Sequence, residues 1–304
     1  MKAAVIGIGS NSVRMLLASL EGQQGKRICR ERAGTRLFAG LDENKRLSPQ
    51  AMAVTVEAVR AMAASAREKG AEEIRLFATS ATRDAANQAD FSRCLLEETG
   101  LRLEICSGDE EAALSFLGAT GGGCCGVIDI GGGSTEFVTG EGRDIRCAFS
   151  CQMGAVRLSQ LLPIASRADI ASVVRLAKDI LEDKLREHPE MKLPEKWIGT
   201  GGTFTTLAAM VRGVHWTDRT YMHGTCLPRE AIERQACLLA DMPVEDRKTI
   251  PGLQPNRADI IVHGICILLA AMERLEIPEI TVSEYGNLDG YLKDRYGVMG
   301  EIAP

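Results

Sequence analysis

The stretch VIDIGGGSTE, residues 127–136, raises two questions: which fold places acids beside glycines in this way, and which ligand the glycines admit. An apolar run carries Asp129 into three consecutive glycines, and a serine, a threonine and Glu136 follow. Glycine can take positive φ and lets a ligand approach the main chain closely, and successive N–H groups in such a turn form an anion-binding concavity. Carboxylates reach phosphate through a divalent cation. The stretch therefore indicates a metal–phosphate site, with a glycine-rich turn between solvated acids as the alternative.

The segment after the glycines, STEFVTGEG at 134–142, is β-branched and alternating and ends in a second turn signal. This pattern predicts a returning strand. A dinucleotide-binding fingerprint or a P-loop would open a helix instead, and a P-loop also needs a Gly-Lys-Ser/Thr sequence that is absent here. We therefore expect a strand–turn–strand unit.

A second copy of this unit lies at the start of the chain, where residues 5–14 read VIGIGSNSVR. Gly7 stands where the later copy has Asp129. Repeats of this kind predict two similarly built domains facing one cleft. The matched pairs are Ile6 with Ile128, Ile8 with Ile130, Gly9 with Gly131, and Ser12 with Ser134.

The size and composition indicate a globular protein with no nucleic-acid partner. At about 100–200 residues per domain, 304 residues predict two domains. The chain is 45% apolar, 25% charged and 4% aromatic. Its net charge of −5 offers no basic surface for nucleic acid, and its low aromatic content argues against base-stacking platforms.

The ten cysteines do not form a disulfide or zinc pattern. The sequence contains no CxxC pair, and Cys147 and Cys151 have no histidine beside them, so a zinc site is not expected. The N-terminus lacks a signal-peptide layout, and no apolar run reaches the ~18 residues of a membrane span. A cytoplasmic protein without a membrane partner is expected.

Strands alternate with helices along the chain, which predicts an α/β protein, and the hairpins predict mixed sheets. Ser48 and Pro49 are expected to begin a long helix that reaches about Lys69. The run GGGCC at 121–125 is interpreted as a hinge. It separates an expected first domain, 1–121, from a second, 122–304, whose last helix either stays there or packs back on the first.

Three further segments carry candidate chemistry. In SGDEEAA, 107–113, Ser107 and Glu110 form an expected capping box, which leaves Glu111 without a required structural role. Arg83 follows a strand, where its forked donors suit phosphate. The alternatives are a solvated helix acid and a surface arginine. A third glycine turn, GTGGTFTT at 199–206, leads into a helix whose first N–H groups can hold an anion.

Eight segments together resemble one family. GSNSVR, ATSATRDAAN, SGDEEAALSFLGA, VIDIGGGSTEFV, MGAVRL, GTGGTFTTLAA, RADIIVHG and ITVSEYG occur in the order seen in exopolyphosphatases and guanosine-pentaphosphate phosphohydrolases. The resemblance, which is to the short form of that family, covers essentially the whole chain. It implies the α/β fold of the actin-like superfamily: two actin-like (ribonuclease H-like) domains with mixed sheets flanked by helices, and an active site in the interdomain cleft.

The resemblance implies a phosphoanhydride hydrolase that uses Mg²⁺ or Mn²⁺. Its leading form is a metal-dependent exopolyphosphatase, which releases terminal orthophosphate from inorganic polyphosphate. The alternatives are a pppGpp 5′-phosphohydrolase, a non-catalytic polyphosphate or alarmone sensor and, more remotely, a sugar-kinase-like transferase. The expected partners are polyphosphate or guanosine penta- and tetraphosphate, and homodimer formation is left open.

Residue roles follow from the same resemblance. Glu111 is the implied catalytic base, Asp129 and Glu136 serve the metal and the attacking water, and Arg83 contacts phosphate. The family usually has aspartate where this chain has Gly7. We therefore expect Gly7→Asp to lower the half-saturating Mg²⁺ concentration, whereas a misfolded product would mark Gly7 as structural. The expected phosphate-binding set is Ser10, Asn11, Arg83, Gly131, Gly132, Gly133, Ser134, Gly201, Gly202 and Thr203.

Overall fold

The chain folds into two compact units in the computed structural model, which describes residues 1–218 and 221–303. The first unit holds residues 1–121 and also the chain from Asn287 onward, and the second holds residues 122–286. The boundary therefore falls within the glycine run at 121–123. Cys124 and Cys125, which were interpreted as part of a hinge, begin a strand instead.

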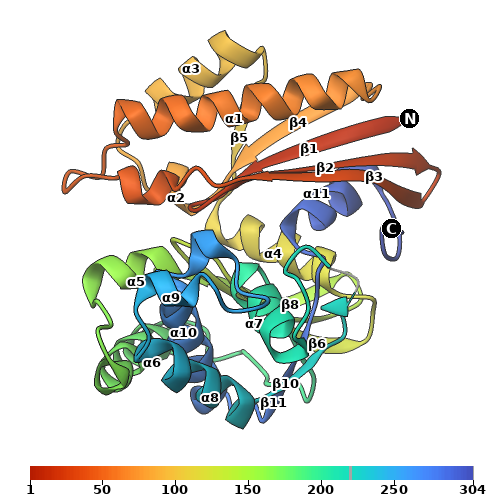
Figure 1. Cartoon of the computed structure of the whole chain (residues 1–304). Coiled ribbons are helices and arrows are strands. Elements are labelled where there is room, and N and C mark those ends of the chain that lie inside the picture. Colours follow the sequence, from red (N-terminus) through yellow and green to blue (C-terminus); the bar gives the residue numbers. More distant parts are fainter. Residues whose placement is uncertain (219–220, 304) are drawn as a thin grey trace. The chain divides into compact units, whose positions relative to one another are not determined.

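The first unit is built on a five-stranded mixed sheet in the order β3-β2-β1-β4-β5. In Figure 1, α1 and α3 lie on one face of this sheet and α4 and α11 on the other. The elements are β1 (Lys2–Ile8), β2 (Val13–Glu21), β3 (Gln24–Ala33), η1 (Leu37–Gly40), α1 (Pro49–Glu68), β4 (Glu73–Ala78), α2 (Ser80–Arg83), α3 (Gln88–Thr99), β5 (Leu103–Ile105), α4 (Gly108–Ala119) and α11 (Asn287–Tyr296).

Helix α1 begins and ends within a residue of its expected bounds. The Ser48 hydroxyl accepts a hydrogen bond from the Ala51 N–H at 3.2 Å, and Pro49 occupies the first helical position. Both features satisfy or remove main-chain donors that a helix N-terminus leaves unpaired. The buried side chains of α1 recur at helical spacing and include Val56, Val59 and Met62.

Helix α11 belongs to the first unit because it packs closely on α4. A Cβ added to Gly290 would lie 1.8 Å from the Leu114 carbonyl oxygen, so only glycine permits this approach. The Lys293 ammonium donates to the carbonyls of Leu117 at 2.8 Å and Gly118 at 3.3 Å. A cation at the end of α4 also suits the helix dipole.

We expect Gly290→Ala to lower the free energy of unfolding by about 2 kcal/mol, because the two helix backbones must separate. Denaturant unfolding measures the change. Gly25→Ala is the matched control, since a Cβ there makes only ordinary contacts at 3.4 Å with Ile302 and Val298. Equal stability of the two variants would contradict the close contact between α4 and α11.

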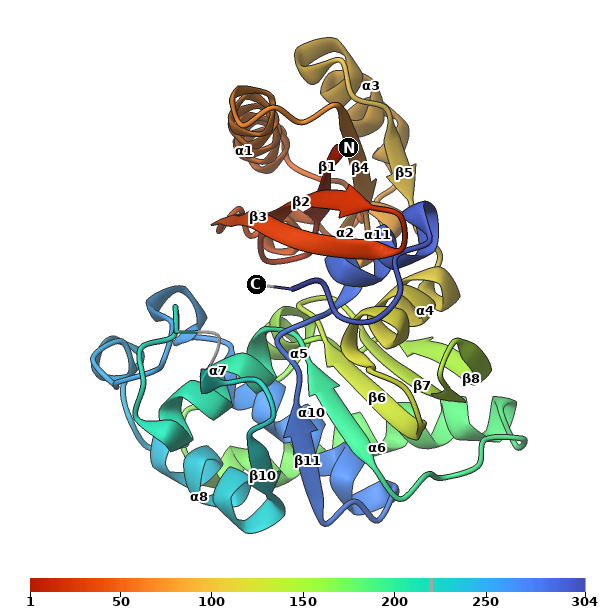
Figure 2. The same cartoon turned by 90° about the vertical axis from the view of Figure 1, so that its right-hand side faces the viewer.

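The second unit contains a six-stranded mixed sheet in the order β10-β11-β9-β6-β7-β8. Its helices cover one face of the sheet in Figure 2. The elements are β6 (Cys124–Ile130), β7 (Thr135–Glu141), β8 (Asp144–Cys151), α5 (Ala155–Leu161), η2 (Arg167–Asp169), α6 (Ile170–Glu187), β9 (Trp197–Thr200), α7 (Gly202–Arg212), β10 (Cys226–Pro228), α8 (Arg229–Ala240), α9 (Val244–Arg247), η4 (Pro255–Arg257), α10 (Ile261–Arg274) and β11 (Glu279–Val282).

Five strands in each unit share one topology, which confirms the mixed sheets that the hairpins predicted, and the second unit adds β10, which pairs antiparallel with β11. In the first unit, β3, β2 and β1 pair antiparallel, and β4 and β5 continue in parallel. In the second unit, β8, β7 and β6 pair antiparallel, and β9 and β11 continue in parallel. In each antiparallel trio the pairing of the middle strand with the outer strand also has a register shift, after Leu17 and after Thr139. The sequence repeat is therefore a structural repeat.

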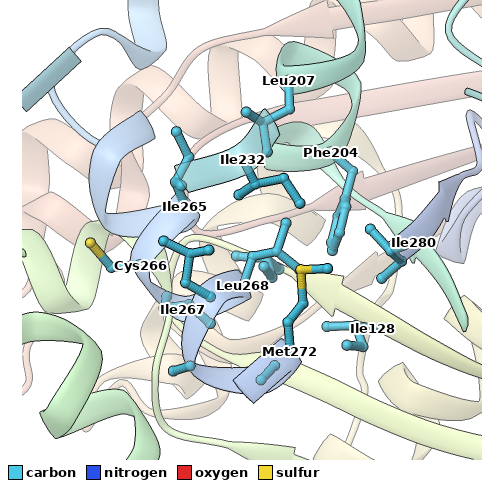
Figure 3. Close-up of a cluster of buried hydrophobic side chains, with 14 of the residues drawn as sticks. Ile128, Phe204, Leu207, Ile232, Ile265, Cys266, Ile267, Leu268, Met272 and Ile280 are labelled. Atoms are coloured by element: carbon cyan, nitrogen blue, oxygen red, sulfur yellow. The ribbon is translucent and has the colours of Figure 1, made fainter. Parts of the chain in front are cut away.

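The core of the second unit is centred on α10, which is buried over nearly its whole surface. Figure 3 shows Ile265, Leu268 and Met272 of this helix among side chains from the surrounding elements. A helix that is apolar on all sides is typical of a core position. The neighbours drawn there come from β6 (Ile128), α7 (Phe204, Leu207), α8 (Ile232) and β11 (Ile280).

Candidate functional site

In the first unit, the candidate residues lie at one edge of the sheet. Strands β1, β4 and β5 run parallel, so their carboxyl ends meet at the same edge, where ligands bind in open α/β sheets. The turn at 9–12 follows β1, the segment at 79–83 follows β4, and the segment at 106–111 follows β5. The fold thus brings together three motifs that are far apart in the sequence.

In the turn after β1, the main-chain carbonyls accept hydrogen bonds from other main-chain groups, and polar side chains are buried. Gly9 N–H donates to the Ser12 carbonyl at 3.0 Å, and the carbonyls of Ser10 and Asn11 accept from N–H groups in the segment that leads into η1. Asn11 is only 6% exposed, yet its side-chain nitrogen and oxygen have no hydrogen-bond partner among the described residues. Buried polar atoms are rarely unpaired, so the Asn11 amide is suited to a ligand.

Arg83 and Glu111 form an ion pair at this edge. The Arg83 guanidinium donates to the Glu111 carboxylate at 3.1 Å and to the Cys106 carbonyl at 2.9 Å. Their side chains are 19% and 8% exposed, so Arg83 is not the surface arginine, nor Glu111 the solvated acid, of the alternative interpretations. The second terminal nitrogen of Arg83 is buried and has no hydrogen-bond partner in the part of the chain that the structure describes, and the same holds for the hydroxyls of Ser80 and Thr82. These donors favour an anion.

The acids beside this ion pair have separate roles. Ser107 and Glu110 form the capping box that the sequence predicted: the Ser107 N–H donates to the Glu110 carboxylate at 2.7 Å, and the Glu110 N–H to the Ser107 hydroxyl at 3.2 Å. The hydrogen bond from the Ser107 N–H to the carboxylate, followed by that from the Ser107 hydroxyl, lowers the pKa of Glu110. Burial, followed by the charges of Glu111 and Glu110, raises the pKa of the Cys106 thiol to about 12. The thiol thus stays protonated at neutral pH, and a thiolate nucleophile is not part of this edge.

In the second unit, the turn after β6 repeats the geometry of the first turn. Gly131 N–H donates to the Ser134 carbonyl at 3.0 Å. The first residues of α5 donate to two carbonyls of the turn. Ala155 N–H donates to the Gly131 carbonyl at 3.0 Å, and Val156 N–H donates to the Gly132 carbonyl at 2.9 Å. With the carbonyls held by α5, the turn can present its N–H groups to an anion.

The glycines of this turn do not use the positive φ that glycine permits: Gly131, Gly132 and Gly133 are not among the residues with positive φ. Close packing requires a further glycine beside the turn, because a Cβ added to Gly154 would lie 2.3 Å from the Gly132 carbonyl group. The helix can approach the turn only without that Cβ.

Asp129 and Glu136 stand directly opposite each other on β6 and β7. Residues opposite each other on adjacent antiparallel strands have neighbouring side chains on one face. The row continues on both sides, since Thr200 of β9 pairs with Asp129, and Ser150 of β8 pairs with Glu136. The Ser150 hydroxyl donates to the Glu136 carboxylate at 2.8 Å. The sheet register therefore gathers two buried carboxylates and two hydroxyls.

The third glycine turn lies next to this row. Gly201 has φ +94°, and a Cβ there would lie 2.6 Å from Asp129 Oδ1, so the residue must be glycine on both counts. Gly202 begins α7 and packs against the Arg257 guanidinium, which would overlap a Cβ at 1.8 Å. The Thr203 side chain faces α10 instead, where a Cβ on Gly264 would lie 2.4 Å from its hydroxyl oxygen. Only the main chain of Thr203 is therefore suited to an anion.

Two arginines in this region were not among the sequence candidates. Arg257 lies against Gly202, and the Arg157 Nε donates to the Gly133 carbonyl at 2.7 Å. The segments MGAVRL and RADIIVHG contain them, but neither segment shows by its spacing that its arginine reaches a glycine turn. The sequence does not show that these arginines lie close to the glycine turns, because this proximity arises only when the chain folds.

Comparison with known proteins identifies the family of the chain. The model of the Ppx/GppA phosphatase family matches residues 18–297. The chain belongs to this family.

Two relatives of this Ppx/GppA protein bear the names of phosphoanhydride hydrolases. Exopolyphosphatase 2 of Mycobacterium tuberculosis is 33% identical, and the alignment covers 95% of this chain and 97% of the relative. A guanosine-5′-triphosphate,3′-diphosphate pyrophosphatase of Vibrio vulnificus is 30% identical, over 98% of this chain and 59% of the relative. The expectation of a phosphoanhydride hydrolase is thus confirmed at the level of the family.

Solved structures confirm the fold. An exopolyphosphatase-like protein with 28% identity superposes with a TM-score of 0.87 over 98% of this chain and 99% of that one. The Ppx/GppA enzyme of Aquifex aeolicus, also 28% identical, has a TM-score of 0.81 over 97% and 99%. The predicted α/β architecture with two mixed, helix-flanked sheets of the actin-like type is therefore correct.

The surroundings of Gly7 differ from those of Asp129, which occupies the matching position in the second copy of the repeat. A Cβ at Gly7 would lie 3.0 Å from both Leu288 Cδ2 and Phe77 Cζ, which belong to an apolar cluster of the first unit. Val5, two residues earlier on the same strand face, is in that cluster. The atoms nearest to such a Cβ in this Ppx/GppA protein are therefore hydrocarbon, while Arg14 stands opposite Gly7 on β2. The close contact with Leu288 and Phe77 favours a packing role for the glycine.

We expect Gly154→Ala to raise the KM for the phosphate substrate roughly tenfold, because the added Cβ displaces a turn that must be positioned closely. Steady-state kinetics measures this change. Ser159→Ala on the same helix is the control, since it removes only a hydrogen bond to the Val156 carbonyl. If Gly154→Ala has wild-type KM, the turn at 131–134 does not bind the substrate.

Within the described residues, no helix combines the length and the apolar character of a membrane span.

Proposed function

We propose that this chain is a metal-dependent exopolyphosphatase that releases terminal orthophosphate from inorganic polyphosphate. The repeated turns carry the proposal: Gly9 to Ser12 and Gly131 to Ser134 are closed by the same hydrogen bond, 3.0 Å in each unit. Each turn offers main-chain donors to anionic oxygens. The near end-to-end match to exopolyphosphatase 2 of Mycobacterium tuberculosis supports polyphosphate as the substrate.

Asp129 and Glu136 are the proposed holders of Mg²⁺ or Mn²⁺. The two carboxylates are 9% and 1% exposed and stand opposite each other, where like charges repel, so a bound cation between them is favourable. Oxygen ligands of this type suit Mg²⁺. When bound, the cation neutralises charge on the phosphoryl oxygens.

Glu111 is the proposed base and Arg83 a phosphate ligand. Hydrolysis of a phosphoanhydride depends mainly on positioning and charge stabilisation. In the proposed reaction, the Glu111 carboxylate orients the attacking water and accepts its proton, while the donors of Arg83 and Asn11 bind phosphoryl oxygens. Arg83 also holds the Glu111 carboxylate in place, at 3.1 Å. The expected position of the site in the interdomain cleft stays a prediction.

Two alternatives each have one observation in their favour. The relative from Vibrio vulnificus, named for its action on guanosine-5′-triphosphate,3′-diphosphate, favours a pppGpp phosphohydrolase. Gly7, in place of the family's usual aspartate, favours a sensor that binds without turnover.

The test is orthophosphate release from polyphosphate and from pppGpp in parallel, each titrated with Mg²⁺ and Mn²⁺. We expect release from polyphosphate that depends on the cation and is abolished by chelation. Turnover of pppGpp alone would replace the leading proposal by the first alternative. Binding of either compound, measured by calorimetry, without release under any cation would establish the sensor.

A further inference from the structure

Three side chains of different ligand type meet in the second unit, away from the row of Asp129 and Glu136. Cys147 lies on β8, and His188 and Glu190 lie just after α6. The thiol sulfur, a ring nitrogen and a carboxylate oxygen all lie within 4.8 Å of one another. The sequence showed no histidine beside Cys147, and the fold supplies one from 41 positions further along the chain.

The spacing of these atoms fits tetrahedral zinc. Zinc bonds are about 2.3 Å to sulfur, about 2.0–2.1 Å to nitrogen and about 2.0–2.2 Å to oxygen, so tetrahedral ligand atoms lie about 3.4–3.6 Å apart. Here Cys147 Sγ is 3.8 Å from Glu190 Oε1, and His188 Nδ1 is 3.2 Å from the same oxygen. Small side-chain shifts would bring both pairs to the zinc distances.

The surrounding residues hold the ligands in position. The His188 ring stacks on Phe149 with centroids 4.9 Å apart and planes 12° apart, and Phe149 stacks on Phe137 at 5.4 Å. Cys147 is buried, whereas Glu190 is exposed, so the group opens toward solvent on one side. The stacking on Phe149 fixes the orientation of the His188 ring. The open side leaves room for a water molecule as a further ligand.

The ligand types identify the metal class. A thiolate with an imidazole suits Zn²⁺ and related borderline-soft ions, whereas Mg²⁺ prefers an all-oxygen site such as the one suggested for Asp129 and Glu136. We propose that Cys147, His188 and Glu190 bind one Zn²⁺ ion, with water in the fourth position. The ion ties the segment after α6, residues 188–196, to strand β8. This site is independent of the proposed hydrolysis.

The experiment measures metal binding to the purified full chain in excess Mg²⁺, which occupies oxygen-only sites. We expect equilibrium dialysis to find one tightly bound Zn²⁺ per chain. Cobalt in place of zinc is expected to give the thiolate-to-cobalt charge-transfer band and a tetrahedral visible spectrum. Affinity is expected to fall on acidification, because the thiol and the imidazole must lose protons to bind.

Three variants and two controls assign the site. Glu190→Gln and His188→Gln are expected to weaken zinc binding roughly tenfold or more. Loss of an outer-shell partner alone lowers metal affinity by about tenfold or more, and loss of a ligand is expected to lower it at least as much. Cys147→Ser is expected to abolish the charge-transfer band. Cys237→Ser and His215→Gln, which change an exposed thiol and an exposed imidazole, are expected to bind as the wild type does.

Two results would overturn the proposal: no zinc retained by the wild type, or binding that Glu190→Gln and His188→Gln leave unchanged. Because Glu190 is exposed, Glu190→Gln remains informative even if Cys147→Ser fails to fold.

Discussion

Glu111→Gln is expected to reduce the rate of phosphate release by roughly 10²-fold or more, while folding and substrate binding stay close to wild type. This is the usual scale for loss of a general base. Glutamine keeps an oxygen that can accept from Arg83, which now donates to Glu111 at 3.1 Å, so the local structure is preserved. Single-turnover kinetics with polyphosphate, together with calorimetric binding, separates the chemical step from affinity.

The neighbouring Glu110→Gln is the matched control. Glu110 closes the capping box, and its replacement is expected to cost about 1 kcal/mol of stability or less, with little change in turnover. If the two variants exchange these effects, the base has been assigned one position too far along the helix.

The capping role of Glu110 can be tested separately by pH. Hydrogen bonds from the Ser107 N–H and hydroxyl lower the pKa of Glu110 in the folded protein. A lowered pKa contributes stability that is present above the unfolded-state value and lost as pH falls through the folded-state value. The stability difference between wild type and Glu110→Gln is therefore expected to shrink in acid. A difference that grows in acid would contradict the capping assignment.

Gly7→Asp is expected to lower the free energy of unfolding by about 2 kcal/mol, the scale for overpacking, since Arg14 opposite Gly7 on β2 offsets part of the added charge. The added Cβ would lie 3.0 Å from Leu288 and Phe77, which belong to an apolar cluster, and the carboxyl group adds further volume. Denaturant unfolding at neutral pH measures the effect. Gly7→Ala adds the Cβ without the charge and is expected to be clearly more stable than the aspartate variant.

The same variant tests the metal interpretation of Gly7. If Gly7→Asp is as stable as the wild type and lowers the half-saturating Mg²⁺ concentration, the position belongs to the cation site and the packing role is wrong. If the variant is destabilised and its Mg²⁺ titration is unchanged, Gly7 is a packing residue.

Local patterns in the sequence were sufficient for the architecture. The strand–turn–strand repeat predicted the two similar sheets, because each copy carries its own alternation and glycine turn. The Ser48–Pro49 helix start and the Ser107–Glu110 capping box were also predicted correctly, since both depend on residues within one turn of helix. Such features involve only neighbours in the chain.

Only the tertiary structure decided how distant residues meet. Sheet register placed Thr200 and Ser150 on either side of Asp129 and Glu136, and helix packing placed Arg257 against Gly202. The sequence alone supplied the glycines of the turn at 131–133, whereas the fold shows that α5 approaches this turn so closely that a Cβ on Gly154 would block the contact. The close contact at Gly7 likewise depends on Leu288, 281 positions further along the chain, whose side chain would lie 3.0 Å from an added Cβ. Long-range packing sets these environments, and short-range residue patterns do not encode it.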